Sequence, residues 1–316
     1  MRMIVTLFIV GSAIFAGYWA IAAQLITRFA PDTLAQTAHL AATPREVTGF
    51  PFAFRTELED LTLKNQDQTF NWHVPLVALE AASHLPTRVD ARFSRTQAID
   101  YLGLRIALHH DGMHADLAVD HRLRVTSASG SIRSATATPP VFLQSLDGLQ
   151  AVLKQAEGEQ YTLNWTAQGL RLSPEARLAL DPSGTHPEQI ENLEFKADIA
   201  FAGPLALNAP MPQPLSISLR DIAVDWGEFT LSGDGQLQKA AAGGFDGTLS
   251  LRLQDWRVLH ALLVDTGTIA PDAAMMAGMF LASQAEPGGT SINLPLNIAN
   301  SAVAFGPFVI GRLPRF

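Results

Sequence analysis

The chain has 316 residues, of which 47% are apolar and only 16% charged, and its net charge at pH 7 is −8. This length is enough to bury a large core, in one long domain or two. The acidic balance, without any run of Lys or Arg, argues against nucleic-acid binding, which needs basic patches to neutralise phosphates. The absence of cysteine removes disulfides, thiolate metal sites and thiol nucleophiles, and it suits an exported protein.

The first predicted element is an apolar segment, residues 3–27, with no charge between Arg2 and Arg28. It is long enough for one membrane helix, which needs about 20 residues. Arg2 predicts a cytoplasmic N-terminus and a periplasmic remainder by the positive-inside rule. The alternative is a cleaved signal peptide, because residues 20–22 read as an A-x-A cleavage site. The apolar run is longer than the usual signal-peptide core of about 7–15 residues, so we expect residues 1–28 to be an uncleaved, single-pass inner-membrane anchor.

Residues 29–48 are expected to be a juxtamembrane linker. A short helix is expected over residues 31–42, because Pro31 and Asp32 suit a first helical turn. From residue 49 onwards the apolar period changes to two, as in residues 102–108, 193–201, 215–219 and 249–253. Such alternation is typical of antiparallel strands with one apolar face. We therefore expect residues 49–316 to form a periplasmic β-rich domain, either undivided or with two similar halves that meet near residues 140–160.

Helical spacing of apolar residues occurs in three places, residues 142–153, 256–267 and 271–284. These predict a few short helices within the mainly β chain. The third contains Met275, Met276, Met279 and Phe280. We expect the Met side chains to fill an irregular part of the core, which is the commonest role of Met.

Two hairpins can be registered from their turn signals. A two-residue turn at Asp111-Gly112 would pair His109 with His114 and Ile106 with Leu117. The other hairpin lies near the C-terminus, where Asn300 and Ser301 can form a turn because Asn tolerates a left-handed backbone. This turn places Ile298 opposite Val303 and Leu296 opposite Phe305, and Phe308 and Ile310 continue the apolar row.

No motif in the sequence assigns a reaction. There is no nucleophile elbow, P-loop or H-E-x-x-H, so we predict a protein that is not an enzyme, with no catalytic residue and no cofactor. His109 and His114, as cross-strand neighbours, would lie near enough to share a metal. A third ligand on the same face is missing, so a solvated polar tip is the favoured interpretation. The glycines of residues 232–237 are interpreted as strand or bulge positions.

The strands carry more apolar surface than a few short helices can cover. They must either close into a two-sheet sandwich or form one extended, curved sheet with an apolar groove. A groove would bind acyl chains, because burial of each CH₂ is worth about 0.8 kcal/mol. The candidate lipid-contacting residues lie on three predicted strands: Leu249, Leu251, Leu253, Leu294, Leu296, Ile298, Val303, Phe305, Phe308 and Ile310.

The chain resembles the bacterial envelope family known as domain of unknown function 2125. The resemblance rests on residues 48–55 (TGFPFAFR), 72–75 (WHVP) and 294–316 (LPLNIANSAVAFGPFVIGRLPRF). The C-terminal third is also similar to AsmA-like proteins, a likeness that implies an elongated, apolar-lined β-sheet with a role in lipid homeostasis or outer-membrane assembly. The final turn departs from that pattern, because Asn300-Ser301 replaces an acidic residue followed by Gly.

Three functional hypotheses follow. The first is a membrane-anchored periplasmic domain that binds or shields lipid acyl chains. The second is a scaffold that binds another envelope protein by strand addition. The third, least favoured, is a metal-dependent hydrolase built on His109 and His114.

Overall fold

The computed structural model describes residues 40–45, 47–49, 53–65, 69–82, 85, 87–241, 243–286, 289–305 and 308–313. The predicted anchor, residues 1–28, and most of the predicted linker helix lie outside these ranges. The last three residues of that expected helix, 40–42, belong instead to a β-strand. Among the helices that are described, none is long and apolar enough to cross a membrane.

The chain divides into two compact units. Unit 1 comprises residues up to 140 together with 147–163 and 201–213, and unit 2 comprises residues 141–146, 164–200 and 214–316. The boundary runs through strand β12 (Gln160–Leu172), and it also separates the end of β13 (Gln189–Phe201) from the rest of that strand.

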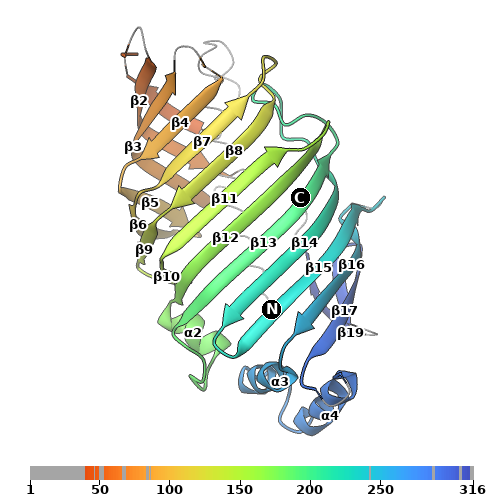
Figure 1. Cartoon of the computed structure of the whole chain (residues 1–316). Helices are drawn as coiled ribbons and strands as arrows, with labels where there is room; N and C mark the ends of the chain where they lie inside the picture. Colours follow the sequence, from red (N-terminus) through yellow and green to blue (C-terminus); the bar gives the residue numbers. More distant parts are fainter. Residues whose placement is uncertain are drawn as a thin grey trace. The chain divides into compact units, whose positions relative to one another are not determined.

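Unit 1 is a series of antiparallel strands (Figure 1). They are β1 (Leu40–Pro44), β2 (Ala53–Lys64), β3 (Phe70–Ala82), β4 (Arg88–Phe93), β5 (Thr96–Tyr101), β6 (Leu104–Asp111), β7 (His114–Val119), β8 (Val125–Ile132), β9 (Ser134–Thr138) and β11 (Gly148–Gln155). The core of this unit contains Leu61, Val74, Val77, Val125 and Tyr161, none of which is measurably exposed.

Two extended runs of unit 1 are each interrupted once, one between β4 and β5 and the other between β6 and β7. Arg92 in β4 lies opposite His114 in β7, and Thr96 in β5 lies opposite His109 in β6. Residues 88–101 and 104–119 therefore form one long antiparallel hairpin. Its turn is at Leu102 and Gly103, whose φ angles are +50° and +82°.

The predicted hairpin turn at Asp111-Gly112 is therefore wrong. The Phe93 N–H donates to the Met113 carbonyl (3.3 Å), and the His110 N–H donates to the Arg95 carbonyl (2.9 Å). Two residues, 111 and 112, thus oppose only Ser94, which defines a β-bulge. Gly112 has φ +66°, a left-handed conformation that a bulge needs as much as a turn does. The Asp111-Gly112 sequence thus forms a bulge instead of the predicted turn.

Unit 2 contains the remaining strands, which pair in antiparallel succession from β14 to β19. They are β10 (Leu143–Leu146), β14 (Pro214–Trp226), β15 (Phe229–Lys239), β16 (Phe245–Leu253), β17 (Ile292–Ala299), β18 (Ala302–Phe305) and β19 (Phe308–Arg312), with most of β12 and β13. The predicted helix over residues 142–153 is wrong, because these residues form β10 and β11. The break at Asp147 shifts the phase of the alternation and imitates helical spacing.

Short helices lie at one end of the strands of unit 2 (Figure 1). They are α2 (Pro174–Leu180), α3 (Trp256–Asp265) and α4 (Ala274–Gln284). Helix α2 was not predicted from the sequence, although its start carries a clear signal. The Ser173 side chain accepts a hydrogen bond from the Ala176 N–H (3.0 Å), and Pro174 occupies the first turn, as an N-capped helix requires. The helices expected near residues 256–267 and 271–284 are confirmed as α3 and α4.

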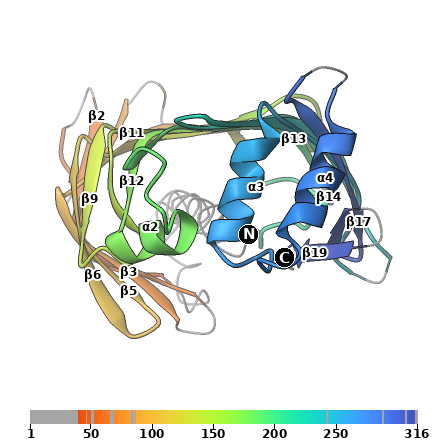
Figure 2. The ribbon, with the colours of Figure 1, turned by 90° about the horizontal axis from the view of Figure 1, so that it is seen from below.

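Seen from the helical end in Figure 2, the strands of unit 2 follow a curve, and α3 and α4 lie side by side across its end. His260 of α3 contacts α4 directly, with its Nε2 atom 2.8 Å from the Ala274 carbonyl oxygen. The prediction of a mainly β chain with antiparallel strands and a few short helices is confirmed.

Candidate functional site

The closing hairpin of unit 2 has the predicted register. Ile298 pairs with Val303 and Leu296 with Phe305. Asn300 and Ser301 form the turn, with φ angles of +48° and +64°. The turn is tied to β16 because the Phe245 N–H donates to the Ser301 hydroxyl (3.1 Å). This anchoring fixes which side chains of β17 and β18 share a side of the sheet.

Directly paired residues of antiparallel strands place their side chains on the same side. Leu249 lies opposite Leu296, and Leu251 lies opposite Leu294. Together with neighbouring strands these residues form a continuous surface that we call the apolar face: Ile217, Leu237, Phe245, Leu249, Leu251, Leu296, Ile298, Val303, Phe305 and Leu313. It contains most of the lipid-contacting residues predicted from the sequence.

The apolar face has a buried part and a half-buried part. Five members are buried: Leu237, Phe245, Leu296, Ile298 and Val303. Four others on the paired strands, Ile217, Leu249, Leu251 and Phe305, are only half-buried. Large aliphatic and aromatic side chains are normally buried in a finished core, so this half-buried part is apolar surface that is not fully covered.

Other predicted lipid-contacting residues have different positions. Leu253 is 1% exposed and lies opposite the fully buried Ile292, so it belongs to the sealed core. Leu294 is half-buried beside Leu251. Phe308 and Ile310 lie in β19, where the structure describes only their backbone.

The strand β15 carries glycines where the apolar face passes over it. Gly233 lies opposite Leu251, and Gly235 lies opposite Leu249. A Cβ atom added at Gly235 would lie 2.4 Å from the side chain of Leu249 and 2.5 Å from the Thr248 carbonyl oxygen. The two leucine side chains of β16 therefore lie directly over the backbone of β15. The interpretation of these glycines as strand positions is confirmed.

Helix α4 touches the apolar face through Phe280, which the sequence places beside the Met cluster in the predicted helix. The rings of Phe280 and Phe305 meet edge-on, with centroids 5.8 Å apart. The expectation that the Met cluster fills the core is wrong. Met275, Met276 and Met279 are 76%, 69% and 60% exposed, and Leu281 is the buried residue of this helix.

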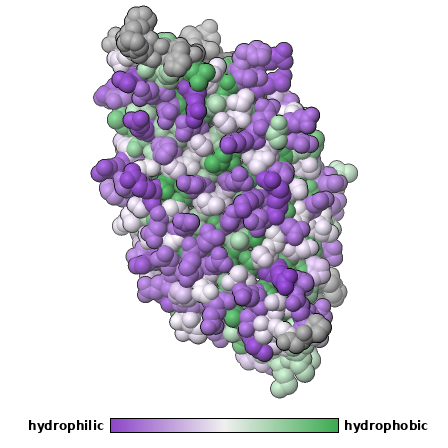
Figure 3. Space-filling model, in the orientation of Figure 1, coloured by the Kyte–Doolittle hydropathy of each residue, from purple (hydrophilic) through white to green (hydrophobic). Residues whose placement is uncertain are grey.

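The opposite side of the same strands is polar. Along β16 the exposed positions are Asp246, Thr248, Ser250 and Arg252, and they alternate with members of the apolar face. In Figure 3 most of the visible surface is hydrophilic. A sheet that separates polar and apolar residues in this way is built to place one side against an apolar partner.

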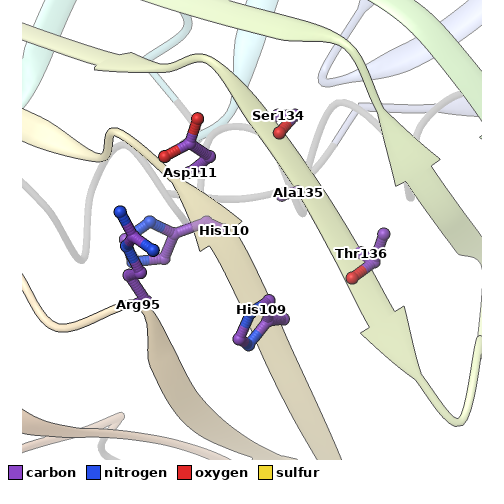
Figure 4. Close-up of a pocket in the computed structure, with 7 residues that line it drawn as sticks. All are labelled: Arg95, His109, His110, Asp111, Ser134, Ala135 and Thr136. Atoms are coloured by element: carbon purple, nitrogen blue, oxygen red, sulfur yellow. The ribbon is translucent and has the colours of Figure 1, made fainter.

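A polar pocket of about 160 Å³ lies in unit 1, next to the β-bulge (Figure 4). Its lining residues are Arg95, His109, His110, Asp111, Ser134, Ala135 and Thr136. The Asp111 carboxylate lies 3.8 Å from the Arg133 guanidinium, and the Nδ1 atom of His109 lies 3.0 Å from the Thr96 hydroxyl. These are exposed groups of mixed charge on a bent strand, and we assign no reaction to them.

The histidine that is buried at this bend is His110. The Met113 N–H donates to its Nδ1 atom (3.3 Å), so the proton lies on Nε2, which donates to the Ser94 carbonyl (2.8 Å). Gln97 completes the cluster by accepting a hydrogen bond from the Trp72 indole N–H (2.7 Å). Burial is the main cause that lowers the pKa of His110 below its ordinary value of 6.5. The bend is thus held by a neutral histidine.

The predicted pairing of His109 with His114 is wrong. Both lie on the same extended run of residues 104–119, and they pair with different neighbours: His109 with Thr96 and Thr136, and His114 with Arg92 and Ser131. Within the part of the chain that the structure describes, no group of three or more His, Asp or Glu side chains could hold a metal ion.

One protein-family model matches most of the chain. The model of the family described as "Uncharacterized protein conserved in bacteria (DUF2125)" matches residues 19–314. The chain belongs to this family. The resemblance noted from the sequence is therefore confirmed, whereas the likeness of the C-terminal third to AsmA-like proteins stays a prediction. No curated protein matches the chain, and no solved structure matches it.

Proposed function

We propose that this DUF2125 protein is an inner-membrane-anchored envelope protein whose unit 2 binds or shields lipid acyl chains on the apolar face. The single observation that carries the proposal is the half-buried part of that face, Ile217, Leu249, Leu251 and Phe305. These side chains lie on a curved sheet whose other side is polar. An acyl chain laid along them would complete their burial.

Acyl-chain binding fits a site without chemical motifs. Each CH₂ group removed from water contributes about 0.8 kcal/mol, and this gain needs apolar area rather than a particular residue. The apolar face offers aliphatic and aromatic side chains of that kind on consecutive strands. An AsmA-like curved sheet, with a role in lipid homeostasis or outer-membrane assembly, is the finer form of this proposal.

The membrane anchor is the second part of the proposal. Residues 3–27 contain no charged residue, and such a segment is long enough to cross a bilayer. A tether of this kind keeps an apolar face close to a source of lipid. Strand addition to another envelope protein, the alternative function, would use backbone groups of a sheet edge and not the apolar face.

The proposal is tested by measuring the phospholipid that stays bound to the purified full-length chain after extensive detergent washing. We expect the wild type to retain phospholipid and the Phe305→Asp variant to lose most of it. Asn297→Asp is the matched control, because Asn297 lies on β17 between Leu296 and Ile298 and is exposed. Equal retention in the wild type and Phe305→Asp would overturn the proposal, because annular lipid around the anchor would then explain all of it.

A further inference from the structure

Helix α4 is uncharged along its whole length and yet largely exposed. Its sequence, AMMAGMFLASQ, contains no Asp, Glu, Lys or Arg. Met275, Met276, Met279 and Phe280 are 46–76% exposed. A helix that is apolar on all sides is normally buried in a core or in a membrane. In unit 2 the outer surface of α4 is exposed, although its apolar sequence is typical of a helix that is buried in a core or in a membrane.

We infer that α4 is the element of unit 2 that inserts into the surface of a phospholipid bilayer. Met275, Met276, Met279 and Phe280 form the surface in question, which we call the α4 patch. Figure 3 shows moderately hydrophobic residues at the tip where α4 lies. Interfacial helices bury their apolar residues about 5–10 Å into the boundary between headgroups and acyl chains.

The absence of charge favours a bilayer over a protein partner. Protein interfaces surround an apolar centre with a polar rim, but no face of α4 supplies charged residues for such a rim. Four side chains of this size expose a few hundred square ångströms, whereas a stable interface buries about 800 Å² on each partner. A second copy bound through the α4 patch alone would therefore fall short of that area. Met side chains are also flexible enough to adapt to a fluid surface.

The predicted membrane anchor would tether the chain to a bilayer. The uncharged segment of residues 3–27 is followed by residues 28–39, which can extend to at most about 40 Å. The first described strand, β1 of unit 1, would then begin within that distance of the membrane, so the chain that carries α4 is tethered to a bilayer. This part of the inference rests on the proposed function, because it takes residues 1–28 as an anchor.

The position of Phe280 connects the α4 patch with the apolar face. Phe280 is part of the patch, and its ring also meets Phe305 at 5.8 Å. An acyl chain that leaves the bilayer beside α4 would therefore find apolar side chains without a polar interval between them. The inference thus adds an entrance to the proposed lipid-binding face.

The test uses the absence of cysteine from the chain. A Met276→Cys variant of the full-length chain is labelled with an environment-sensitive fluorophore and reconstituted in phosphatidylcholine vesicles. Met211→Cys is the matched control, because Met211 is 57% exposed and lies outside any helix. Replacing the lipid by phosphatidylcholine with brominated acyl chains quenches only probes that reach the hydrocarbon boundary.

We expect brominated lipid to cause a roughly twofold loss of emission at position 276 and little change at position 211, since an interfacial helix buries its apolar residues at that depth. Adding Met275→Asp and Met279→Asp should abolish the quenching. No quenching at position 276, or equal quenching at both positions, would overturn the inference. A shielded probe that responds to protein dilution but not to bromine would assign the α4 patch to a second copy. The phospholipid-retention assay of Phe305→Asp is independent of this signal, so failure of the proposed function and failure of this inference can be told apart.

Discussion

The ring of Phe280 in α4 meets the ring of Phe305 in β18 edge-on, with centroids 5.8 Å apart and planes inclined at 69°. Aromatic pairs in this arrangement contribute about 0.5–1.5 kcal/mol beyond their buried area. The contact joins the α4 patch to the half-buried part of the apolar face. Substitutions at this contact can test whether the apolar face of unit 2 is open or sealed.

The substitution Phe305→Asp should leave the chain folded, whereas Val303→Asp should destabilise it strongly. Phe305 is half-buried at the edge of the apolar face, but Val303 is 8% exposed and packs in its buried part. An unpaired carboxylate in a core costs several kcal/mol, but one that reaches solvent costs much less. Urea unfolding of both variants measures the difference. If both unfold alike, Phe305 is a core residue and the face is sealed.

Gly235→Ala should destabilise unit 2 by about 1–3 kcal/mol, because the new methyl group overpacks a filled space. A Cβ atom there would lie 2.5 Å from the Thr248 carbonyl oxygen. The control is Gly203→Ala, where the nearest atom, the Cβ of Pro212, is 4.0 Å away. Thermal unfolding of the two variants should separate clearly. Equal midpoints would show that β15 and β16 are not in the close contact described.

Leu102→Asn should stabilise the chain by about 1 kcal/mol, because Asn tolerates the left-handed conformation better than Leu does. Leu102 has φ +50° and is 68% exposed, so little packing is lost with its side chain. Chemical denaturation measures the gain. A loss of stability would mean that residues 102–103 are not the turn of the long hairpin.

His110 should make unit 1 less stable in mild acid. Its pKa in the folded state is lowered, chiefly by burial and further by His109 and Arg95, and this outweighs the hydrogen bond to the Ser94 carbonyl and the Asp111 carboxylate, both of which raise the pKa. The folded state thus favours neutral histidine, so its stabilisation is complete above pH 6.5, decreases as the unfolded chain takes up the proton, and is gone below the folded-state pKa. The measurement is the denaturation midpoint between about pH 7.5 and 5.

The matched variant for this prediction is His110→Gln, which does not titrate. We expect its midpoint to fall less over the same pH range than that of the wild type. Parallel pH profiles would show that other histidines, and not the buried His110, cause the acid sensitivity.

The closing hairpin could be predicted because its local signals agree with each other. Asn300 and Ser301 are flanked by alternating apolar residues on both sides, and only one register places Ile298 opposite Val303. The alternation in residues 193–201 and 249–253 likewise gave the correct strands, because β13 and β16 run without interruption there.

The errors in the strand assignments occurred where strands are interrupted. Gly112 satisfies a turn and a bulge equally well, and the true turn at Leu102-Gly103 begins with a residue that disfavours a positive φ. Asp147 separates β10 from β11 and so produces apolar spacing of three and four residues. The position of a bulge depends on pairing with strands that are distant in the sequence. A single sequence does not show which strands pair.

The exposure of α4 could not be predicted for a different reason. Its composition is that of a core helix. Only its packing beside α3 shows that Met275, Met276 and Met279 are exposed. The pairing of Phe280 with Phe305 depends on the same packing.

The most direct test of lipid binding on the apolar face is photocrosslinking from Phe305 in cells. A benzophenone amino acid replaces Phe305 in the full-length chain, and a second chain carries it at the exposed Asn297. After irradiation, mass spectrometry identifies what is attached at each position. The account predicts phospholipid adducts at position 305 and not at position 297. A protein adduct at 305, or equal lipid labelling at both positions, would contradict it.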